Sequence, residues 1–343
     1  MTADTSVLDF HMAPLRPLLD AANVTELVIN RPGEVGVEVG AGWQWHELPE
    51  LNLEWLETIG NSVANFTKQS LTAETPICST SLPSGERVQV VAPPACEAGS
   101  YSITIRKPST KTFTLDDLDK GGLFEGTKIA AARSSDADEE LIALKMQGNW
   151  PKFLALAVKA KKNILISGAT GSGKTTLSKA LIKLIPDHER LLTIEDTREL
   201  EVQHRNCVHM LYSKDGQGQA KVGAKHLLEA SLRMRPDRIL LQELRDGTAF
   251  FYLRNVNSGH PGSITTVHAD SAELAFEQLT LLVKESEGGR DLDRADIRSL
   301  LHLLVDVVVQ CKKIDGRFKA TEIYFEPESG NLNRSPKLRA VNA

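Results

Sequence analysis

The stretch that decides the fold is the run Gly168-Ala169-Thr170-Gly171-Ser172-Gly173-Lys174-Thr175. It fits the pattern G-x-x-x-x-G-K-[ST], in which glycines let the backbone curl so that its N–H groups face a bound phosphate. Residues 163–167 before it are mostly apolar and typical of a buried strand, and residues 176–185 after it predict a helix that ends before Pro186. The pattern therefore occurs between a strand and a helix N-terminus, where the helix dipole also favours an anion.

This loop predicts a nucleotide site. Lys174 can reach the β- and γ-phosphates, and the hydroxyl of Thr175 can ligate Mg²⁺. The predicted ATP-binding residues are Gly168, Ala169, Thr170, Gly171, Ser172, Gly173, Lys174, Thr175 and Thr176. The alternative is a chance match in a glycine-rich turn, which the flanking strand and helix argue against.

Composition limits the class of protein. The chain has 343 residues, enough for two domains, and a formal net charge of -5, which disfavours a strongly basic nucleic-acid binder. We expect no membrane span, because no apolar run is long enough, and no secretory signal, because residues 1–9 lack the basic-then-apolar pattern. The four cysteines form no C-x-x-C pair, which fits a reducing cytoplasm better than a zinc or dithiol site.

The chain divides into three parts. Residues 1–107 predict a small α+β domain with helices at 14–22 and 53–68 and strands at 24–30, 35–39, 43–47, 77–82, 87–92 and 101–106. Residues 108–149 predict a linker with short helices. In residues 150–343 strands are expected at 163–167, 191–195, 207–211, 238–242, 263–267 and 306–311, and helices at 175–185, 224–234, 246–256, 272–285 and 294–304.

Apolar strands that alternate with helices indicate an α/β domain with a parallel sheet and helices on both faces. Ligands of such sheets bind outside the carboxyl ends of the strands. Two acidic positions are expected at that edge. Glu195 ends one predicted strand, and Glu243 follows Gln242 at the end of another, as in a Walker-B strand. Either acid could hold Mg²⁺ or polarise water, or could simply cap a helix.

Histidine and arginine supply further candidates. His268 ends the predicted strand 263–267 and could contact a γ-phosphate, whereas His260, beside a turn, is expected to be structural. Arg87 and Arg106 lie on adjacent predicted strands of the first domain. Their guanidinium groups suit phosphate, although position alone favours an ordinary exposed sheet face.

With these residues in place, the chain resembles the secretion traffic ATPases, and among them the type IV secretion branch. The resemblance covers roughly residues 15–325. Besides the phosphate loop, it is carried by the acidic box at 193–200, the segment 233–245, the histidine box at 259–268, and the segments 85–91 and 102–108. The type II secretion branch often carries a four-cysteine module, which this sequence lacks.

The resemblance implies a hexameric ring of subunits, each with a small N-terminal domain, a RecA-like C-terminal domain and nucleotide between them. It implies that Lys174 and Thr175 bind phosphate and Mg²⁺, and that Glu195 and Glu243 are catalytic acids. It also implies that His268 senses the γ-phosphate and that Arg87 and Arg106 approach the nucleotide. The family usually has glycine where this chain has Gln242.

The expected function is therefore ATP hydrolysis that powers substrate transfer or pilus biogenesis by a bacterial type IV secretion or conjugation machine. The resemblance implies a cytoplasmic enzyme on the inner membrane, with other secretion ATPases and inner-membrane components as partners. Alternatives are a nucleic-acid-stimulated RecA-type motor, a type II secretion or type IV pilus ATPase, and a scaffold that binds ATP but barely hydrolyses it. Direct binding of nucleic acid is left open.

Overall fold

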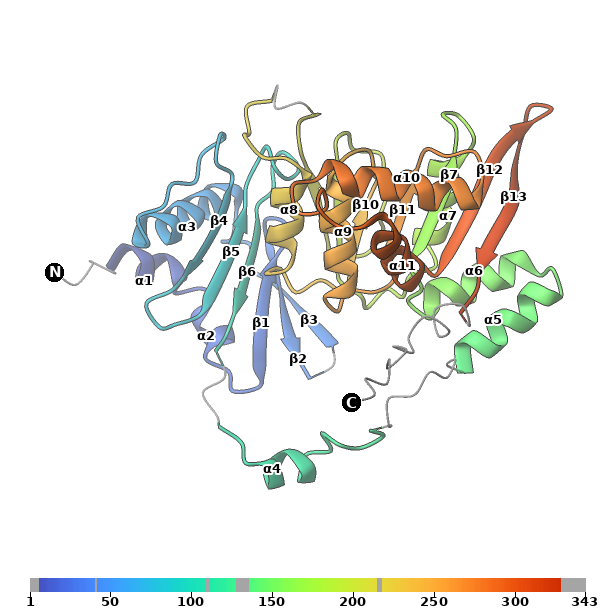
Figure 1. Ribbon diagram of the computed structural model, residues 1–343. Coiled ribbons are helices and arrows are strands. Elements are labelled where there is room, and N and C mark those ends of the chain that lie inside the picture. Colours follow the sequence, from blue (N-terminus) through green and yellow to red (C-terminus); the bar gives the residue numbers. More distant parts are fainter. Residues whose placement is uncertain (1–5, 41, 109–111, 128–135, 215–217, 328–343) are drawn as a thin grey trace, which may run out of the picture.

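The computed structural model describes residues 6–40, 42–108, 112–127, 136–214 and 218–327, which form two units (Figure 1). The first is built on an antiparallel sheet in the order β3-β2-β1-β6-β5-β4. Each strand expected between residues 24 and 106 is confirmed to within one residue at either end. The strands are β1 (Val24–Ile29), β2 (Glu34–Val39), β3 (Gly42–Glu47), β4 (Ile77–Ser81), β5 (Arg87–Val91) and β6 (Ser102–Arg106).

One face of this sheet is covered by helices. The helix α3 (Leu53–Phe66) begins where the side chain of Asn52 accepts a hydrogen bond from the backbone N–H of Trp55. The predicted helix at 14–22 is reduced to α2 (Arg16–Leu19), and α1 (Ser6–Met12) was not predicted. Apolar side chains of alternate strand residues pack against these helices, among them Leu27, Ile29, Val88, Val90, Ile103 and Ile105.

The intervening strand residues form a polar face on the other side. Glu26 on β1 pairs in register with Arg106 on β6, and Arg106 pairs with Arg87 on β5. These three residues line a cavity of about 560 Å³ together with Arg233 and Arg235 from the second unit. The polar face of the first sheet is therefore the face that meets the second unit.

The second unit contains two groups of strands, β10-β8-β9 and β11-β7-β12-β13. A parallel bridge between Glu243 and Thr266 joins them, so the order across the unit is β9-β8-β10-β11-β7-β12-β13. All pairs are parallel except the last, between β12 and β13. The strands are β7 (Ile164–Gly168), β8 (Leu191–Glu195), β9 (Cys207–Leu211), β10 (Arg238–Leu241), β11 (Ile264–Val267), β12 (Val307–Ile314) and β13 (Arg317–Phe325). Six of the seven were predicted, and β13 was not.

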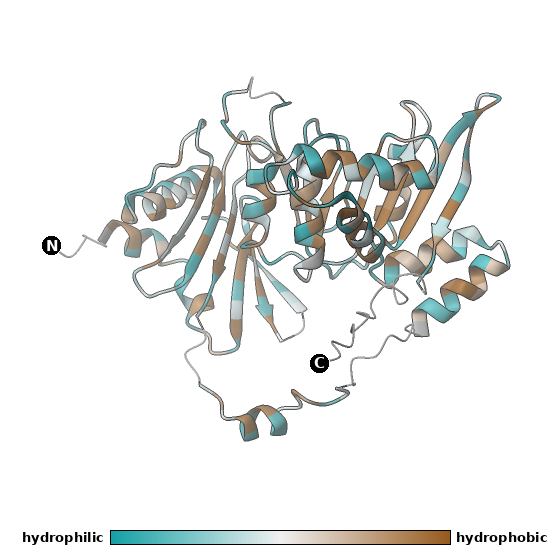
Figure 2. Ribbon diagram, viewed as in Figure 1, coloured by the Kyte–Doolittle hydropathy of each residue, from teal (hydrophilic) through white to brown (hydrophobic). Residues whose placement is uncertain are grey.

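Helices cover both faces of this sheet, as the sequence predicted. One apolar core joins alternate strand residues such as Leu165 and Leu192 to α8 (Ala224–Ser231), α9 (Thr248–Asn257), α10 (Ala272–Glu285) and α11 (Arg294–Leu304). The other core joins residues such as Ile164 and Ile166 to α5 (Asp136–Met146), α6 (Trp150–Lys159) and α7 (Lys174–Ile182). Strands β7, β8, β10 and β11 are buried along their whole length, as expected for a covered parallel sheet, whereas β13 is mostly exposed. The central strands are accordingly largely brown in Figure 2.

The connection between the units has two different parts. The helix α4 (Leu115–Lys120) buries none of its residues and lies apart from both units in Figure 1. In contrast, Leu141 of α5 is fully buried in the same core as Phe153 of α6. We therefore place α5 with the second unit, although the sequence pattern assigned it to the linker.

A fully buried arginine holds the two units together. The guanidinium of Arg190, just before β8, donates hydrogen bonds to Asn30 Oδ1 of the first unit at 2.8 Å and to the carbonyl of Met234 at 2.8 Å. It also donates to Asn206 Oδ1, and to Thr104 Oγ1 at 3.4 Å. Burial lowers the pKa of Arg190 to about 10, so it stays charged at neutral pH. The hydrogen bonds satisfy this buried charge and fix the first unit against the second.

The carboxyl group of Glu26 makes folding stability depend on pH. Its side chain is almost fully buried, and burial raises its pKa from 4.5 to about 7, although Arg106 opposes the shift. Between pH 4.5 and 7 the folded chain keeps a proton that the unfolded chain has released. The free energy of unfolding therefore falls as pH rises through this window, by about 3 kcal/mol from this group alone.

We expect urea denaturation to show that Glu26→Gln is more stable than the parent at pH 8, with a smaller difference at pH 5. The reason is that glutamine keeps the shape of the side chain but cannot ionise. Glu57→Gln, at an exposed position on α3, is the control and should retain the parent's pH dependence. An equal pH dependence in Glu26→Gln and the parent would contradict the prediction.

Candidate active site

The glycine-rich loop has the backbone that phosphate binding requires. It starts where β7 ends at Gly168 and finishes where α7 begins at Lys174. Gly171 and Gly173 have φ angles of +72° and +94°, which side chains other than glycine rarely adopt. A Cβ atom on Gly168 would lie only 2.4 Å from the carbonyl oxygen of Cys311 on β12. These glycines therefore allow the loop to curl tightly between β7 and α7.

Residues 169–176 line a pocket of about 350 Å³. The pocket is completed by residues that follow other strands, namely Glu199, Gln242, Glu243, Arg245 and His268, by Thr266 on β11 and by Phe318 on β13. Three of the predicted catalytic residues, Lys174, Glu243 and His268, thus meet at one pocket, as do Thr175 and Thr176. The structure brings them together because the carboxyl ends of β7, β10 and β11 share one edge of the sheet.

The ammonium group of Lys174 is turned back onto its own loop. It donates hydrogen bonds to the carbonyls of Gly168 at 2.7 Å and Ala169 at 3.0 Å, and lies 3.4 Å from His268 Nδ1. Burial lowers its pKa, and the nearby carboxylate of Glu243 opposes this effect. A phosphate that entered the pocket would offer this cation stronger acceptors than neutral carbonyls.

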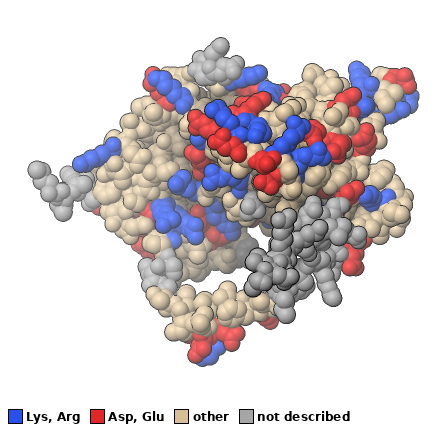
Figure 3. Space-filling view, in the orientation of Figure 1, with Lys and Arg blue, Asp and Glu red and all other residues tan. Residues whose placement is uncertain are grey.

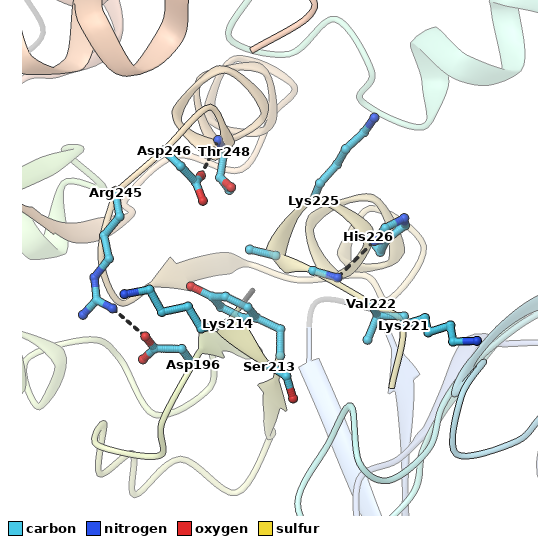
Figure 4. A pocket seen from close by; sticks show the side chains of 13 residues that line it. Asp196, Ser213, Lys214, Lys221, Val222, Lys225, His226, Arg245, Asp246 and Thr248 are labelled. Atoms are coloured by element: carbon cyan, nitrogen blue, oxygen red, sulfur yellow. Dashed lines mark hydrogen bonds and ion pairs between the residues drawn. The ribbon is translucent and has the colours of Figure 1, made fainter. Parts of the chain in front are cut away.

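Glu243 is the centre of a chain of ion pairs. Its Oε1 atom lies 2.6 Å from His268 Nε2, and its Oε2 atom accepts a hydrogen bond of 2.6 Å from Arg245 Nε. Arg245 in turn donates to Asp196 Oδ2 at 2.5 Å. Figure 4 shows this contact from the neighbouring pocket, which Arg245 also lines. Arg245 therefore forms part of the wall between the two pockets and holds one oxygen of the Glu243 carboxylate in place.

The donor groups suit Mg²⁺. The hydroxyl of Thr175 and the carboxylate of Glu243 supply oxygen ligands, which this cation prefers. Ser172 Oγ in the loop is buried and makes no hydrogen bond with the described residues. A buried polar atom without such a partner at a predicted phosphate site is consistent with a bound metal-nucleotide complex.

Glu195, the other expected catalytic acid, does not line this pocket. It is fully buried, and its Oε2 atom accepts hydrogen bonds from the backbone N–H groups of Glu199 at 2.8 Å and Leu200 at 2.7 Å. Its Oε1 atom accepts a hydrogen bond from Thr193. Glu195 thus anchors the turn that brings Glu199 to the pocket. His260 Nδ1 donates a hydrogen bond to the carbonyl of Pro236 at 3.0 Å, as expected for a structural histidine.

Arg87 and Arg106 also lie away from the loop. They line the cavity between the units described above, which shares no residue with the nucleotide pocket. Within one chain, the structure therefore does not bring these arginines to the phosphate loop.

Sequence reasoning did not single out four residues of the pocket, Glu199, Arg245, Thr266 and Phe318. The first three belong to segments that the resemblance highlighted, so their motifs were the available signal. Phe318 comes from β13, which was not predicted, and no sequence pattern pointed to it. Gln242, the departure from the family pattern, lines the pocket, and its backbone N–H bonds to the carbonyl of Ile194 at 3.0 Å.

Comparisons with known proteins identify the family of this chain. A family model described as "Type II/IV secretion system protein" matches residues 56–331. The type IV secretion system protein VirB11 of Bartonella henselae is 54% identical over 327 residues, which cover 92% of each chain. VirB11 of Brucella suis is 44% identical over 328 residues, covering 94% of this chain and 91% of the relative.

A solved structure matches both units. The crystal structure of the VirB11 ATPase from the Brucella suis type IV secretion system, in complex with sulphate, superposes with a TM-score of 0.90 at 43% identity. The match covers 95% of this chain and 99% of that one, and it confirms the predicted fold, a RecA-like α/β domain preceded by a smaller α+β domain. The chain therefore belongs to the type II/IV secretion system protein family, as an ATPase of its type IV secretion branch.

Proposed function

We propose that this chain hydrolyses ATP with Mg²⁺ in the pocket lined by residues 169–176, and that hydrolysis powers substrate transfer or pilus biogenesis by a type IV secretion machine. The observation that carries the proposal is the convergence of Lys174, Glu243 and His268 on the phosphate loop. A phosphoryl-transfer site needs a cation, an acid and a group that contacts the phosphate. Here these three groups follow the carboxyl ends of β7, β10 and β11, respectively.

The loop and its lysine bind the triphosphate. Backbone N–H groups of the loop and of the first turn of α7 face the phosphates, while Lys174 exchanges the carbonyls of Gly168 and Ala169 for β- and γ-phosphate oxygens. Thr175 and Glu243 would hold Mg²⁺, which neutralises charge on the phosphates when it is bound.

Glu243 acts on the attacking water. To accept a hydrogen bond from water, its Oε1 atom must leave the contact with His268, whose imidazole is then available to the γ-phosphate. Arg245 keeps hold of the other oxygen of Glu243 and so fixes the orientation of the carboxylate. Most of the rate acceleration then comes from positioning and from electrostatic stabilisation of the transferring phosphoryl group.

Three of the expected site residues would contribute indirectly, or only after a movement of the units or in an assembly. Glu195 would position the turn that carries Glu199. Since Arg87 and Arg106 line another cavity, they would reach nucleotide either after the units move or in an adjacent copy of the chain. Electron microscopy with a nonhydrolysable ATP analogue would show which copy provides them.

A homohexameric ring is the proposed assembly, with other secretion ATPases and inner-membrane components as partners. The relatives are components of type IV secretion systems. Across the described residues, no helix has both the length and the apolar character needed to cross a bilayer. We propose that the ring acts on the cytoplasmic side of the inner membrane and is held there by its partners.

The nucleic-acid motor is the alternative that a direct experiment should test. Figure 3 shows acidic and basic side chains intermingled over α10 and α11, where Arg298 pairs with Glu273 and Glu277. This face and the net charge of -5 do not form a single-sign surface for a polyanion. Stimulation of the ATPase by DNA with a steep salt dependence would favour the motor.

The proposal is tested by measuring ATP binding and hydrolysis by the purified full chain, with and without Mg²⁺. Magnesium-dependent release of phosphate is the expected result. If the chain took up no adenine nucleotide under any magnesium condition, the proposed function would be wrong.

A further inference from the structure

Phe318 has an unusual place in the pocket. It is the one benzene ring among the described residues that line it, and 58% of the residue is exposed. Its side chain lies against the loop, because a Cβ atom added to Gly173 would be 3.0 Å from its Cγ atom. A largely exposed aromatic ring next to a phosphate loop leaves apolar surface in water, unless a ligand or another chain covers it.

The position of Phe318 is fixed by the sheet. β12 runs parallel to β7, and their last pair in register is Cys311 with Gly168, where the loop begins. Residues 312–314 of β12 and the start of β13 therefore extend past the end of β7 and lie beside the loop. The turn between them is Asp315-Gly316, both with positive φ, as in a tight hairpin. This two-stranded extension carries Phe318 to the loop.

The order of the strands gives the pocket two different sides. Glu243 and His268 follow β10 and β11, on one side of β7, whereas Phe318 comes from the hairpin on the other side. Apart from Lys174 of the loop itself, the groups proposed to act on the γ-phosphate thus lie toward β10 and β11. A nucleotide whose γ-phosphate points that way must leave the loop with its ribose and base toward β12 and β13.

We infer that Phe318 is the platform on which the base of the bound nucleotide stacks. This inference rests on the proposed function, and it adds a residue that positions the nucleoside end of the substrate. Stacking on an aromatic ring does not require a particular base, because every base has a π-face. The ammonium of Lys313 lies over one face of the ring, 5.8 Å from its centroid, and 58% of Phe318 is exposed.

Two substitutions distinguish stacking of the base on Phe318 from packing of the ring against the loop. Phe318→Leu keeps apolar bulk beside Gly173 but removes the aromatic face, whereas Phe318→Trp keeps an aromatic face. Binding of a nonhydrolysable ATP analogue and of inorganic tripolyphosphate, which has no base, is measured calorimetrically on the full chain. Phe10→Leu, which is 74% exposed on α1 of the other unit, is the control.

In Phe318→Leu we expect affinity for the ATP analogue to fall about tenfold. Tripolyphosphate affinity should stay within about twofold, and Phe318→Trp should bind both ligands as the parent does. An equal loss for both ligands would mean that the ring only shapes the loop, and no loss would mean that the base lies elsewhere. A change in assembly size without a change in analogue affinity would assign the ring to a contact between copies. Each of these three results would overturn the inference, whereas absence of ATP hydrolysis in the parent would overturn only the proposed function.

Discussion

Replacing Lys174 by alanine is expected to reduce ATP turnover by a factor on the order of 10³, to the background of the assay. The side chain is the one cation that the described part of the loop places inside the pocket, within reach of the phosphates and of His268. Without this side chain, the negative charge that develops on the transferring phosphoryl group loses its nearest cationic hydrogen-bond donor. Losing one preorganised donor of this kind costs about 10²–10³ in rate, and weaker ATP binding adds to that.

Steady-state phosphate release at saturating ATP is the measurement. Lys183→Ala is the matched control, because Lys183 is an exposed lysine at the opposite end of α7 and should leave turnover unchanged. The variant's thermal unfolding should resemble the parent's, since among the described residues the ammonium contacts its own loop and a half-exposed histidine. Turnover close to that of the parent would refute the assignment of this pocket as the ATPase site.

Glu243→Gln should uncouple binding from hydrolysis. Glutamine retains the size of the side chain and can still accept a hydrogen bond from Arg245, so ATP affinity should change only a few-fold. The glutamine side chain cannot take a proton from the attacking water, and it orients that water less strongly than a carboxylate does. Turnover should therefore fall by a factor of about 10²–10⁴. The measurements are single-turnover hydrolysis and equilibrium binding of ATP in the same buffer.

The control for this variant is Glu229→Gln, at an exposed position of α8, which should behave as the parent. Equal, slow turnover in the parent and in Glu243→Gln would instead favour the nucleotide-gated scaffold that binds ATP but barely hydrolyses it. Equal, fast turnover would mean that Glu243 is not the catalytic acid. Glu199 would then be the candidate, because it is the other glutamate among the described residues that line the pocket.

Glu195 and Glu243 illustrate where prediction from sequence stops. Both glutamates directly follow or end an apolar strand, and both occur in segments that the family resemblance highlighted. In the sheet, however, β8 is separated from β7 by β10 and β11, whereas the end of β10 is bridged to β11 beside the loop. Glu195 consequently satisfies backbone N–H groups of a turn, and Glu243 faces the pocket.

The sequence by itself determined the elements that depend on local patterns. The phosphate loop, its flanking strand and helix, the strand positions and the alternation of strands with helices follow from glycine placement and apolar periodicity, which neighbouring residues decide. The candidate acids, the histidine and the two arginines also came from their positions on predicted strands, and the family resemblance added their roles.

Tertiary structure alone decided which of these candidates meet. The order β10-β11-β7-β12 puts Glu243 and His268 on one side of the loop and Phe318 on the other, while Arg87 and Arg106 line a separate cavity. Apolar periodicity shows which residues of a strand are buried, but it carries no information about which strand lies next to which. Strand order is settled by packing across the whole sheet, between segments that can be a hundred residues apart.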